Sequence, residues 1–335
     1  MNELRVLSIG ILGAARIAPS AICIPAMALS HKLVAVSSRN LEKGKNFADR
    51  WEIKYYLNNY DDLIHHPEID TVYNCLPNSM HAKYNIKALE AGKNVISEKP
   101  FSSNYEEAKQ VAKIASRFNS KIIEAFHYRY HPTTVRAIQI ATSGEIGEVT
   151  KVTSALNIPS PENDDIRWQF ELAGGAMMDL GCYALHIQRH LSLSLFDAEP
   201  NLVFAESKER KPNVDEFMLA NIRYENGAEG EISCNMSYEY FSSPLRIFGT
   251  KGEIYVPSFV LPGQDDRVIV KSPISSRTEH LGRVSSYTWQ LSAFSEYVGG
   301  GSTLTGIEDA LENAKAIDTI YLAAGMKPRV ATPLI

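Results

Sequence analysis

The chain has 335 residues, about twice the usual length of one domain, so we expect two domains. Its 39 acidic and 34 basic residues give a net charge of −5 without a basic tract, which argues against a nucleic-acid-binding protein. A hydrophobic content of 44% excludes wholesale disorder. The four cysteines lie far apart with no CxxC pair, which is typical of a reduced cytoplasmic protein.

The segment Val6–Leu29 is almost uncharged and could be mistaken for a signal or membrane segment. Gly13 and Arg16 split it, and Pro19 and Pro25 would break a spanning helix. A buried strand followed by a helix explains the same composition. We therefore expect no secretory segment, no membrane association and a cytoplasmic location.

The first 125 residues alternate short β-rich runs with helical stretches. Strands are predicted at Val6–Leu12, Leu33–Ser37, Thr71–Cys75, Asn94–Ile96 and Lys121–Ala125. Helices are predicted at Leu41–Arg50, Met80–Ala91 and Tyr105–Phe118, with a stop at Ala91-Gly92-Lys93 and a capping box formed by Asn104 and Glu107. This alternation predicts an α/β domain over residues 1–126, with a doubly wound parallel sheet covered on both faces.

After residue 126 the pattern changes to strands separated by turns. These strands are Val149–Leu156, Phe217–Tyr224, Ala228–Asn235, Pro244–Phe248, Glu253–Val256 and Arg267–Lys271. Asn226-Gly227 predicts a hairpin, and helices are expected at about Gly175–Leu191 and Ile307–Ala324. We expect an α+β second domain over residues 127–335 with a largely antiparallel open sheet, its terminal helix being able to pack back on the first domain.

A degenerate phosphate loop follows the first strand and opens a helix. It reads Gly13-x-Ala15-x-x-Ala18, where dinucleotide-binding loops usually read G-x-G-x-x-G or A, and Ala15 brings a methyl group to the point of phosphate approach. The residues expected at the pyrophosphate are Gly13, Ala14, Ala15, Arg16 and Ile17. The alternative is an ordinary tight strand–helix turn.

The end of the second strand bears on the choice of cofactor. It reads Val36-Ser37-Ser38-Arg39-Asn40, with no carboxylate to bind a ribose 2′-hydroxyl until Glu42. Ser38 can donate a hydrogen bond and Arg39 offers a planar fork for a 2′-phosphate, which favours NADP(H) over NAD(H). The alternative is that Arg39 is a solvated residue at a helix start.

Two segments carry candidate catalytic groups. Glu98-Lys99-Pro100 follows a strand at the carboxyl edge where parallel sheets bind ligands, so Lys99 could polarise a substrate oxygen. Asp179, Tyr183, His186 and His190 share one helix face, which suits proton transfer, although a hydrated polar face is the simpler reading. The two histidines lack the HExxH pattern, and we expect no metal.

Together these pieces resemble the glucose–fructose oxidoreductase / inositol 2-dehydrogenase (Gfo/Idh/MocA) family, nearest its dihydrodiol and xylose dehydrogenase and sugar 3-ketoreductase branch. The resemblance rests on Gly10–Ala18, Leu76-Pro77-Asn78-x-x-His81, Glu98-Lys99-Pro100, Glu124–Pro132, Gly174–Tyr183 and Phe248–Gly252. Lys99 combined with Asp179–Tyr183 is its most specific part, and Ala15 departs from the family's second glycine.

The resemblance implies a Rossmann domain, a C-terminal domain whose open sheet forms homodimer or homotetramer contacts, and hydride exchange between a nicotinamide and a hydroxyl or carbonyl carbon. Lys99 and Tyr183 would be the catalytic pair, with Asp179 shaping the site. The cofactor cleft would be lined by Leu76, Pro77, Asn78, His81 and Glu98.

Further residues have two readings each. Arg167 and Trp168 would contact the nicotinamide or the substrate, or belong to a packed loop. His127 and Arg129 would face the cleft or serve the domain junction, and Tyr287 would reach the substrate or belong to a core face.

The sequence therefore predicts an NADP(H)-dependent oxidoreductase acting on a small sugar, sugar derivative or polyol, in either direction. One alternative is a non-catalytic nucleotide-sensing protein of the same fold, which would need neither Lys99 nor Tyr183. Another is a methyltransferase using S-adenosylmethionine, to which the Lys99/Tyr183 pair and the large second domain give little support.

Overall fold

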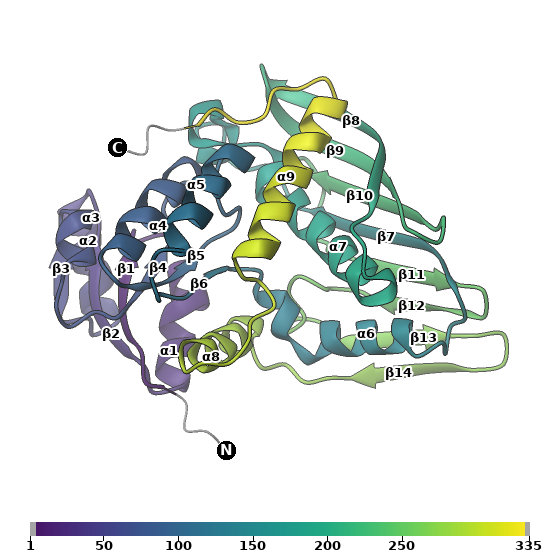
Figure 1. The fold of residues 1–335 in the computed structure, drawn as a ribbon, viewed down its shortest axis with the longest axis horizontal. Helices are drawn as coiled ribbons and strands as arrows, with labels where there is room; N and C mark the ends of the chain where they lie inside the picture. Colours follow the sequence, from purple (N-terminus) through teal and green to yellow (C-terminus); the bar gives the residue numbers. More distant parts are fainter. Residues whose placement is uncertain (1–4, 332–335) are drawn as a thin grey trace. The chain divides into compact units, whose positions relative to one another are not determined.

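The computed structural model describes residues 5–331, which divide into two compact units (Figure 1). The first unit holds the described residues up to Phe126, the segment Tyr287–Ala314 and the described residues from Val330 onward. The second unit holds His127–Ser286 and Lys315–Arg329. The predicted second domain, residues 127–335, includes Tyr287–Ala314. In the structure this segment groups with the first unit.

The first unit is built on a six-stranded parallel sheet in the order β3-β2-β1-β4-β5-β6. Its strands are β1 (Ser8–Leu12), β2 (Lys32–Ser37), β3 (Tyr55–Leu57), β4 (Thr71–Asn74), β5 (Asn94–Ser97) and β6 (Ile122–Glu124). This is the strand order of a dinucleotide-binding Rossmann fold, and it confirms the predicted parallel sheet.

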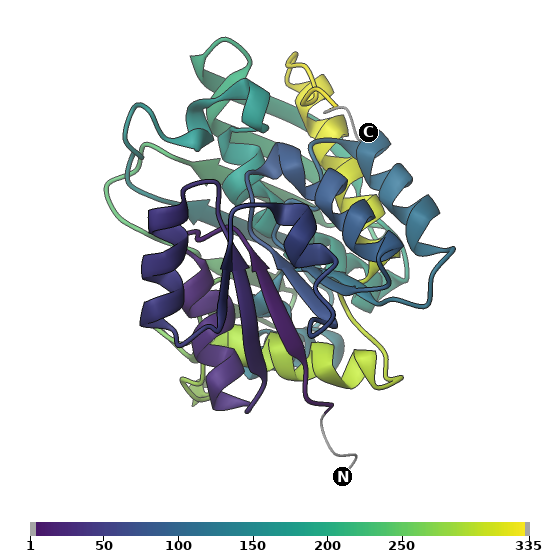
Figure 2. The same ribbon diagram turned by 90° about the vertical axis from the view of Figure 1, so that its left-hand side faces the viewer.

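Helices pack on both faces of this sheet (Figure 2). They are α1 (Ile24–Ala28), α2 (Leu41–Arg50), α3 (Tyr60–Ile64), α4 (His81–Glu90), α5 (Tyr105–Ala115), α8 (Ser286–Val298) and the first part of α9 (Ile307–Ala323). One buried cluster joins β1 to α1 and to Tyr287, Leu291 and Phe294 of α8. A second joins the opposite face to α3, α4, α5 and to Ala310 and Ala314 of α9.

Two predicted helix boundaries in this unit are confirmed. The helix α4 ends at Glu90, and Gly92 follows it with a φ of +73°, which suits glycine at a helix end. At the start of α5, the Asn104 side chain accepts a hydrogen bond from the Glu107 amide at 3.0 Å, while Glu107 accepts one from the Ser103 amide at 2.8 Å.

The second unit is built on an eight-stranded sheet in the order β14-β13-β12-β11-β7-β10-β9-β8. Its strands are β7 (Val149–Asn157), β8 (Asn201–Lys211), β9 (Val214–Arg223), β10 (Glu229–Asn235), β11 (Leu245–Gly249), β12 (Gly252–Val256), β13 (Arg267–Lys271) and β14 (Ser276–His280). All neighbouring pairs are antiparallel except β7 and β10, so the prediction of a largely antiparallel sheet is confirmed. The predicted Asn226-Gly227 turn joins β9 to β10.

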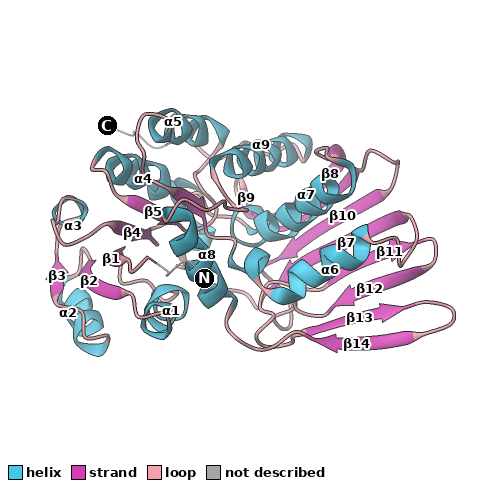
Figure 3. Cartoon of the chain, turned by 60° about the horizontal axis from the view of Figure 1, so that its bottom comes forward, coloured by secondary structure: helices cyan, strands magenta, loops and turns pink. Residues whose placement is uncertain are grey.

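Two helices cover one face of this sheet, as Figure 3 shows. The helix α7 (Cys182–Phe196) packs on β7 and β10, and α6 (Pro132–Thr142) packs on β12 and β13. The part of α9 after Ala314 also belongs to this unit. Between residues 5 and 331, the structure contains no helix that is both long enough and apolar enough to cross a membrane.

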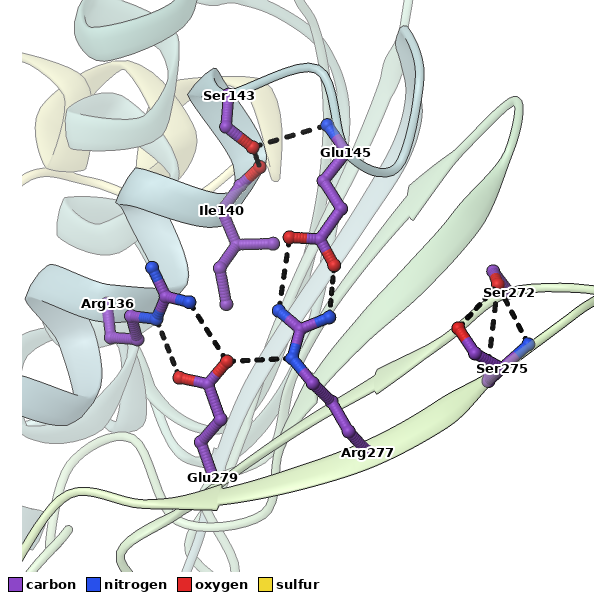
Figure 4. A network of polar contacts seen from close by, with 8 residues as sticks. All are labelled: Arg136, Ile140, Ser143, Glu145, Ser272, Ser275, Arg277 and Glu279. Carbon is purple, nitrogen blue, oxygen red and sulfur yellow. Dashed lines mark hydrogen bonds and ion pairs between the residues drawn. The ribbon is translucent and has the colours of Figure 1, made fainter.

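Ion pairs fasten the edge strand β14 to the α6 side of the sheet (Figure 4). Glu279 accepts hydrogen bonds from Arg136 of α6 at 2.6 and 3.0 Å and from Arg277 at 2.8 Å. Arg277 also pairs with Glu145 in the loop after α6. The adjacent cationic side chains, led by the Arg136 hydrogen bond, lower the pKa of Glu279 to about 2.

Candidate active site

The parallel sheet of the first unit brings most of the predicted site residues to one edge. Gly13 follows β1, Ser38 and Arg39 follow β2, Leu76 lies just beyond β4, and Lys99 just beyond β5. The carboxyl ends of parallel strands share an edge, and the point where strand order reverses, between β1 and β4, is the usual ligand position.

The turn after β1 requires glycine at position 13. Gly13 has a φ of +100°, and its amide donates a hydrogen bond to the Ser37 carbonyl at 2.9 Å. The Cys75 thiol donates to the Gly13 carbonyl at 3.2 Å. A β-carbon at this position would lie 3.4 Å from the Cys75 carbonyl oxygen, in a backbone conformation that other residues rarely adopt. The turn is therefore held between β2 and β4.

The residues after Gly13 differ in exposure. Ala15 and Ile17 are partly buried and pack against the buried core of the first unit. Arg16 is exposed, and a helical segment begins directly afterwards, with Pro19 in its first turn. A left-handed glycine before a helix start is the geometry that presents backbone N–H groups to a pyrophosphate.

Arg39 is exposed directly after β2, whereas Ser38 is buried. The Arg39 side chain interacts with the hydroxyl of Tyr60, the first residue of α3. Burial raises the pKa of Tyr60, and the Arg39 guanidinium opposes that shift. The Tyr60 ring makes an edge contact with the Tyr84 ring, with 5.1 Å between ring centroids. Arg39 thus carries a cation at the carboxyl end of β2, beside two aromatic rings.

Hydrogen bonds from buried side chains fix the loop that carries Lys99. Glu98 accepts a hydrogen bond from the Tyr73 hydroxyl at 2.7 Å. The two ring nitrogens of His81 lie 2.7 Å from the carbonyl oxygens of Pro100 and Leu76. Burial lowers the pKa of His81 to about 4, and the Lys99 ammonium acts in the same direction. Lys99 itself is half-buried, and its peptide bond to Pro100 is cis.

In the second unit, a buried ion pair fixes the start of the helix that carries Asp179 and Tyr183. Asp215 and Arg329 are both fully buried and 2.7 Å apart. Asp215 also accepts hydrogen bonds from the Met177 amide at 2.6 Å and from the Tyr321 hydroxyl at 2.9 Å. Arg329 donates to the Gly174 carbonyl at 2.7 Å. The sequence does not predict this network, because an aspartate in β9 and an arginine far along the chain carry no local signal.

Gly175 completes this helix start. Its φ is +126°, and a β-carbon there would collide with the carboxylate of Asp215 and the guanidinium of Arg329. A π-helical turn, Met177–Gly181, follows and leads directly into α7.

Asp179 lies in the π-helical turn and is paired with Arg167. The Arg167 Nε donates to the Asp179 carboxylate at 2.6 Å, and its Nη1 donates to Asp165 at 3.1 Å. The Asp179 carboxylate, more than any other group, raises the pKa of Arg167. The neighbouring Trp168 is buried, with its indole N–H bonded to the Pro161 carbonyl at 3.2 Å. Trp168 therefore lies in a packed loop, one of the two predicted readings.

Tyr183 is in the first turn of α7 and belongs to a buried polar cluster. Its side chain is 5% exposed, and its hydroxyl lies 3.2 Å from Nε2 of His127, in the 3₁₀ turn His127–Tyr130. The Tyr128 hydroxyl lies 2.5 Å from Nδ1 of His186, and Arg129 donates to Nδ1 of His190 at 3.0 Å. The stripe of Tyr183, His186 and His190 is thus buried and hydrogen-bonded, and the reading of a hydrated face is wrong.

The structure therefore collects the predicted residues in two sets. The first unit holds Gly13–Ile17, Ser38, Arg39, Leu76, Pro77, Asn78, His81, Glu98 and Lys99. The second unit holds His127, Arg129, Arg167, Trp168, Asp179 and Tyr183. Tyr287 lies in the core of the first unit with Leu291 and Phe294, and burial raises the pKa of its phenol. This placement favours the core reading of Tyr287.

Two family models match the chain. One, described as an oxidoreductase family with an NAD-binding Rossmann fold, matches residues 7–126. The other, described as a GFO/IDH/MocA C-terminal domain, matches residues 134–255.

Curated relatives match along most of the chain. The D-xylose 1-dehydrogenase (NADP(+)) 2 of Haloferax volcanii is 31% identical over 324 residues, covering 94% of this chain and 96% of that protein. The dTDP-3,4-didehydro-2,6-dideoxy-alpha-D-glucose 3-reductase of Saccharopolyspora spinosa is 32% identical over 266 residues, covering 78% of each chain.

Solved structures share the fold. A 3-ketoreductase from Actinomadura kijaniata, crystallised with NADP and TDP-benzene, superposes with a TM-score of 0.86 at 23% identity, over 95% of this chain and 98% of that one. A levoglucosan dehydrogenase in complex with NADH and levoglucosan gives a TM-score of 0.85 at 21% identity, over 96% and 98% of the two chains.

Proposed function

This chain belongs to the Gfo/Idh/MocA family of NAD(P)-dependent oxidoreductases, and on that premise we propose an NADP(H)-dependent enzyme that acts on a sugar, sugar derivative or polyol. The reaction is hydride transfer between the nicotinamide and a carbon that bears a hydroxyl or carbonyl group. The observation that carries the proposal is the position of Lys99 at the carboxyl edge of a dinucleotide-type sheet, where its neighbours Glu98 and Pro100 are hydrogen-bonded to Tyr73 and His81. The names of the xylose dehydrogenase and the sugar 3-reductase support the substrate class.

The chemistry divides between the cofactor and two side chains. A bound nicotinamide would supply or accept the hydride. Tyr183 would donate the proton to a substrate carbonyl oxygen, or take it from a hydroxyl in the reverse direction. Lys99 would stabilise the negative charge that develops on that oxygen and favour the ionised phenol of Tyr183. Asp179, paired with Arg167, would set the position of the helix turn before Tyr183.

The cofactor would be held by the first unit. Backbone N–H groups of Gly13–Ile17 would face the pyrophosphate, and Leu76, Pro77, Asn78 and Glu98 would line the cleft. Ser38 and Arg39 would bind the 2′-phosphate of NADP(H), since no carboxylate occupies the end of β2 to select the free ribose of NAD(H).

The NADP(H) preference is tested by binding alone. Titration of the protein's fluorescence with NADPH and NADH should give tighter binding of NADPH. Arg39→Ala should weaken NADPH binding by about tenfold or more, the loss expected for one charge-assisted contact, and leave NADH binding nearly unchanged. Equal affinity of the wild type for both cofactors would contradict the preference.

The catalytic pair is tested by turnover on a panel of aldoses, ketosugars and diols, run in both directions. Lys99→Ala and Tyr183→Phe should each lower turnover by about 10²-fold or more and leave NADPH affinity intact. Tyr128→Phe, which removes a buried phenol hydroxyl from the same cluster, is the matched control and should keep most of the turnover. Unchanged turnover in both test variants would refute the assignment, and NADPH binding without turnover on any substrate would favour a nucleotide-sensing protein.

We also propose that the second unit carries the substrate side of the site and the subunit contacts. The protein would be a cytoplasmic homodimer or homotetramer joined through the open sheet of that unit. Analytical ultracentrifugation of the full chain tests this, and a monomer at micromolar concentration would refute it.

A further inference from the structure

We propose that His127 is a proton relay, which passes a proton between Tyr183 and Ser286. The inference rests on the proposed function, since it assigns the route by which the Tyr183 phenol regains the proton that it gives to substrate. His127 would not touch the reacting atoms, and it acts through Tyr183.

Two hydrogen bonds place the imidazole of His127 between two hydroxyl groups. Its Nε2 lies 3.2 Å from the Tyr183 hydroxyl, and its Nδ1 lies 2.8 Å from the Ser286 hydroxyl. All three side chains are at least nine-tenths buried, with exposed fractions of 5% for Tyr183, 1% for His127 and 3% for Ser286. The rings of His127 and Tyr183 meet edge to face, with 5.7 Å between their centroids.

Hydroxyl groups at both ends let the imidazole work in either tautomer. With the proton on Nδ1, His127 donates to Ser286 and accepts from Tyr183 at Nε2. With the proton on Nε2, it donates to Tyr183 and accepts from Ser286 at Nδ1. Passing one proton from Ser286 to Tyr183 therefore converts the second tautomer into the first while both hydrogen bonds stay in place.

The step balances as a transfer of protons alone. After Tyr183 gives its proton to the substrate oxygen, the phenolate takes the Nε2 proton of His127 while the Ser286 hydroxyl delivers its proton to Nδ1 in the same step, so the imidazole stays neutral. Ser286 takes a replacement proton from water. Gly282, Arg283 and Val284, two to four residues before Ser286, are exposed, and the proposed relay would draw its replacement proton from water on that side. In the oxidation direction every transfer is reversed.

The other titratable groups of this cluster in the second unit are engaged with one another. Tyr128 is bonded to His186, and Arg129 is bonded to His190. The rings of His186 and His190 are in contact, with 4.2 Å between centroids, and Tyr128 also touches the Tyr183 ring, with 5.9 Å between centroids. Among these side chains, His127 places its Nε2 at hydrogen-bonding distance from the Tyr183 hydroxyl.

The first test separates a relay from a role in positioning. His127→Gln can still hydrogen bond to Tyr183 but cannot exchange a proton between two ring nitrogens, and His127→Ala leaves a space that free imidazole can enter. We expect both variants to lose about 10²-fold in steady-state turnover and to retain NADPH affinity. Imidazole should restore turnover to the alanine variant alone. A glutamine variant with full activity, or an alanine variant that imidazole does not rescue, would overturn the relay.

The second test uses the protein without cofactor. In ¹⁵N NMR spectra of histidine-labelled protein, Tyr183→Phe should shift the Nε2 resonance of His127, and Tyr128→Phe should leave it in place. An unmoved resonance in Tyr183→Phe would overturn the proposal. If Tyr183→Phe keeps full turnover, the proposed function itself fails, whereas a dead Tyr183→Phe beside a fully active His127→Gln refutes the relay only.

Discussion

Arg329 offers the sharpest test of what holds the helix start in front of Tyr183. Its guanidinium is fully buried and bonds to the Asp215 carboxylate at 2.7 Å, the Tyr321 hydroxyl at 2.8 Å and the Gly174 carbonyl at 2.7 Å. The substitution Arg329→Met keeps the apolar length of the side chain and removes all three contacts. It leaves Asp215 buried without its cation, and burial already raises the pKa of that carboxyl group.

The expected cost follows from this geometry. Removing one partner of a buried, hydrogen-bonded ion pair destabilises a protein by about 3–5 kcal/mol, because the remaining charge stays desolvated. For a unit of this size such a loss corresponds to a drop in Tm of roughly 10 °C. In Asp215→Asn/Arg329→Met neither charge remains, so the double variant should lose much less than the two single variants together.

Differential scanning calorimetry at pH 7 measures the Tm of the wild type, the two single variants and the double variant, which together form a double-mutant cycle. The matched control is Arg246→Met, the same substitution at a half-exposed arginine of the second unit, which should cost below about 1 kcal/mol. A drop in Tm of Arg329→Met no larger than that of the control, or strictly additive single variants, would refute the reasoning.

Three further predictions concern other buried or paired groups. The pKa of His81 lies near 4 in the folded protein, below its ordinary value of 6.5, so the unfolded state takes up the proton first and stability falls as pH drops from 6.5 towards 4. Chemical unfolding should show a loss of up to about 3 kcal/mol over that window in the wild type and a smaller one in His81→Gln; equal losses would exclude His81 as the source. Burial raises the pKa of Cys23 to about 12, so iodoacetamide at pH 8 should label this thiol only after the protein unfolds. Mass spectrometry measures the labelling, and rapid labelling of the native protein would contradict the burial of Cys23. Glu279→Gln should cost about 1 kcal/mol or less, because its arginine partners are partly exposed, and this cost should vanish in high salt. It should also shrink as pH falls from the ordinary carboxyl pKa of 4.5 to the folded value of about 2, because the lowered pKa stabilises the fold fully only above 4.5. A cost that is independent of salt would exclude ion pairing.

Regular alternation made the first unit predictable from the sequence. Buried parallel strands read as apolar runs, and the turns after β1, β2, β4 and β5 carry the residues that the structure brings to one edge. The place of Tyr183 on a helix, one turn after Asp179, was also predictable from the helical spacing, and its catalytic role stays a prediction.

Other features had no local signal. The strands β8 and β14 lie at the two edges of the second sheet, and their charged sequences, such as Glu206–Lys211, obscure the alternation typical of a half-buried strand. The partnership of Asp215 with Arg329 joins residues 114 positions apart, and that of His127 with Ser286 joins residues 159 positions apart. Such contacts arise only from the tertiary fold.

The first unit is built from segments that lie far apart in the sequence, and this affects how it can fold during synthesis. Tyr287, Leu291 and Phe294 of α8 complete a buried cluster whose other members come from residues 7–125. A nascent chain that has left the ribosome only as far as Phe126 therefore exposes the apolar surface that α8 covers in the finished protein. The intervening residues 127–286 form an insertion within this Rossmann unit. The unit gains α8 only after residues 287–314 have been synthesised. We expect a fragment ending at Phe126 to be aggregation-prone, and co-expression of a peptide spanning residues 287–314 to improve its solubility.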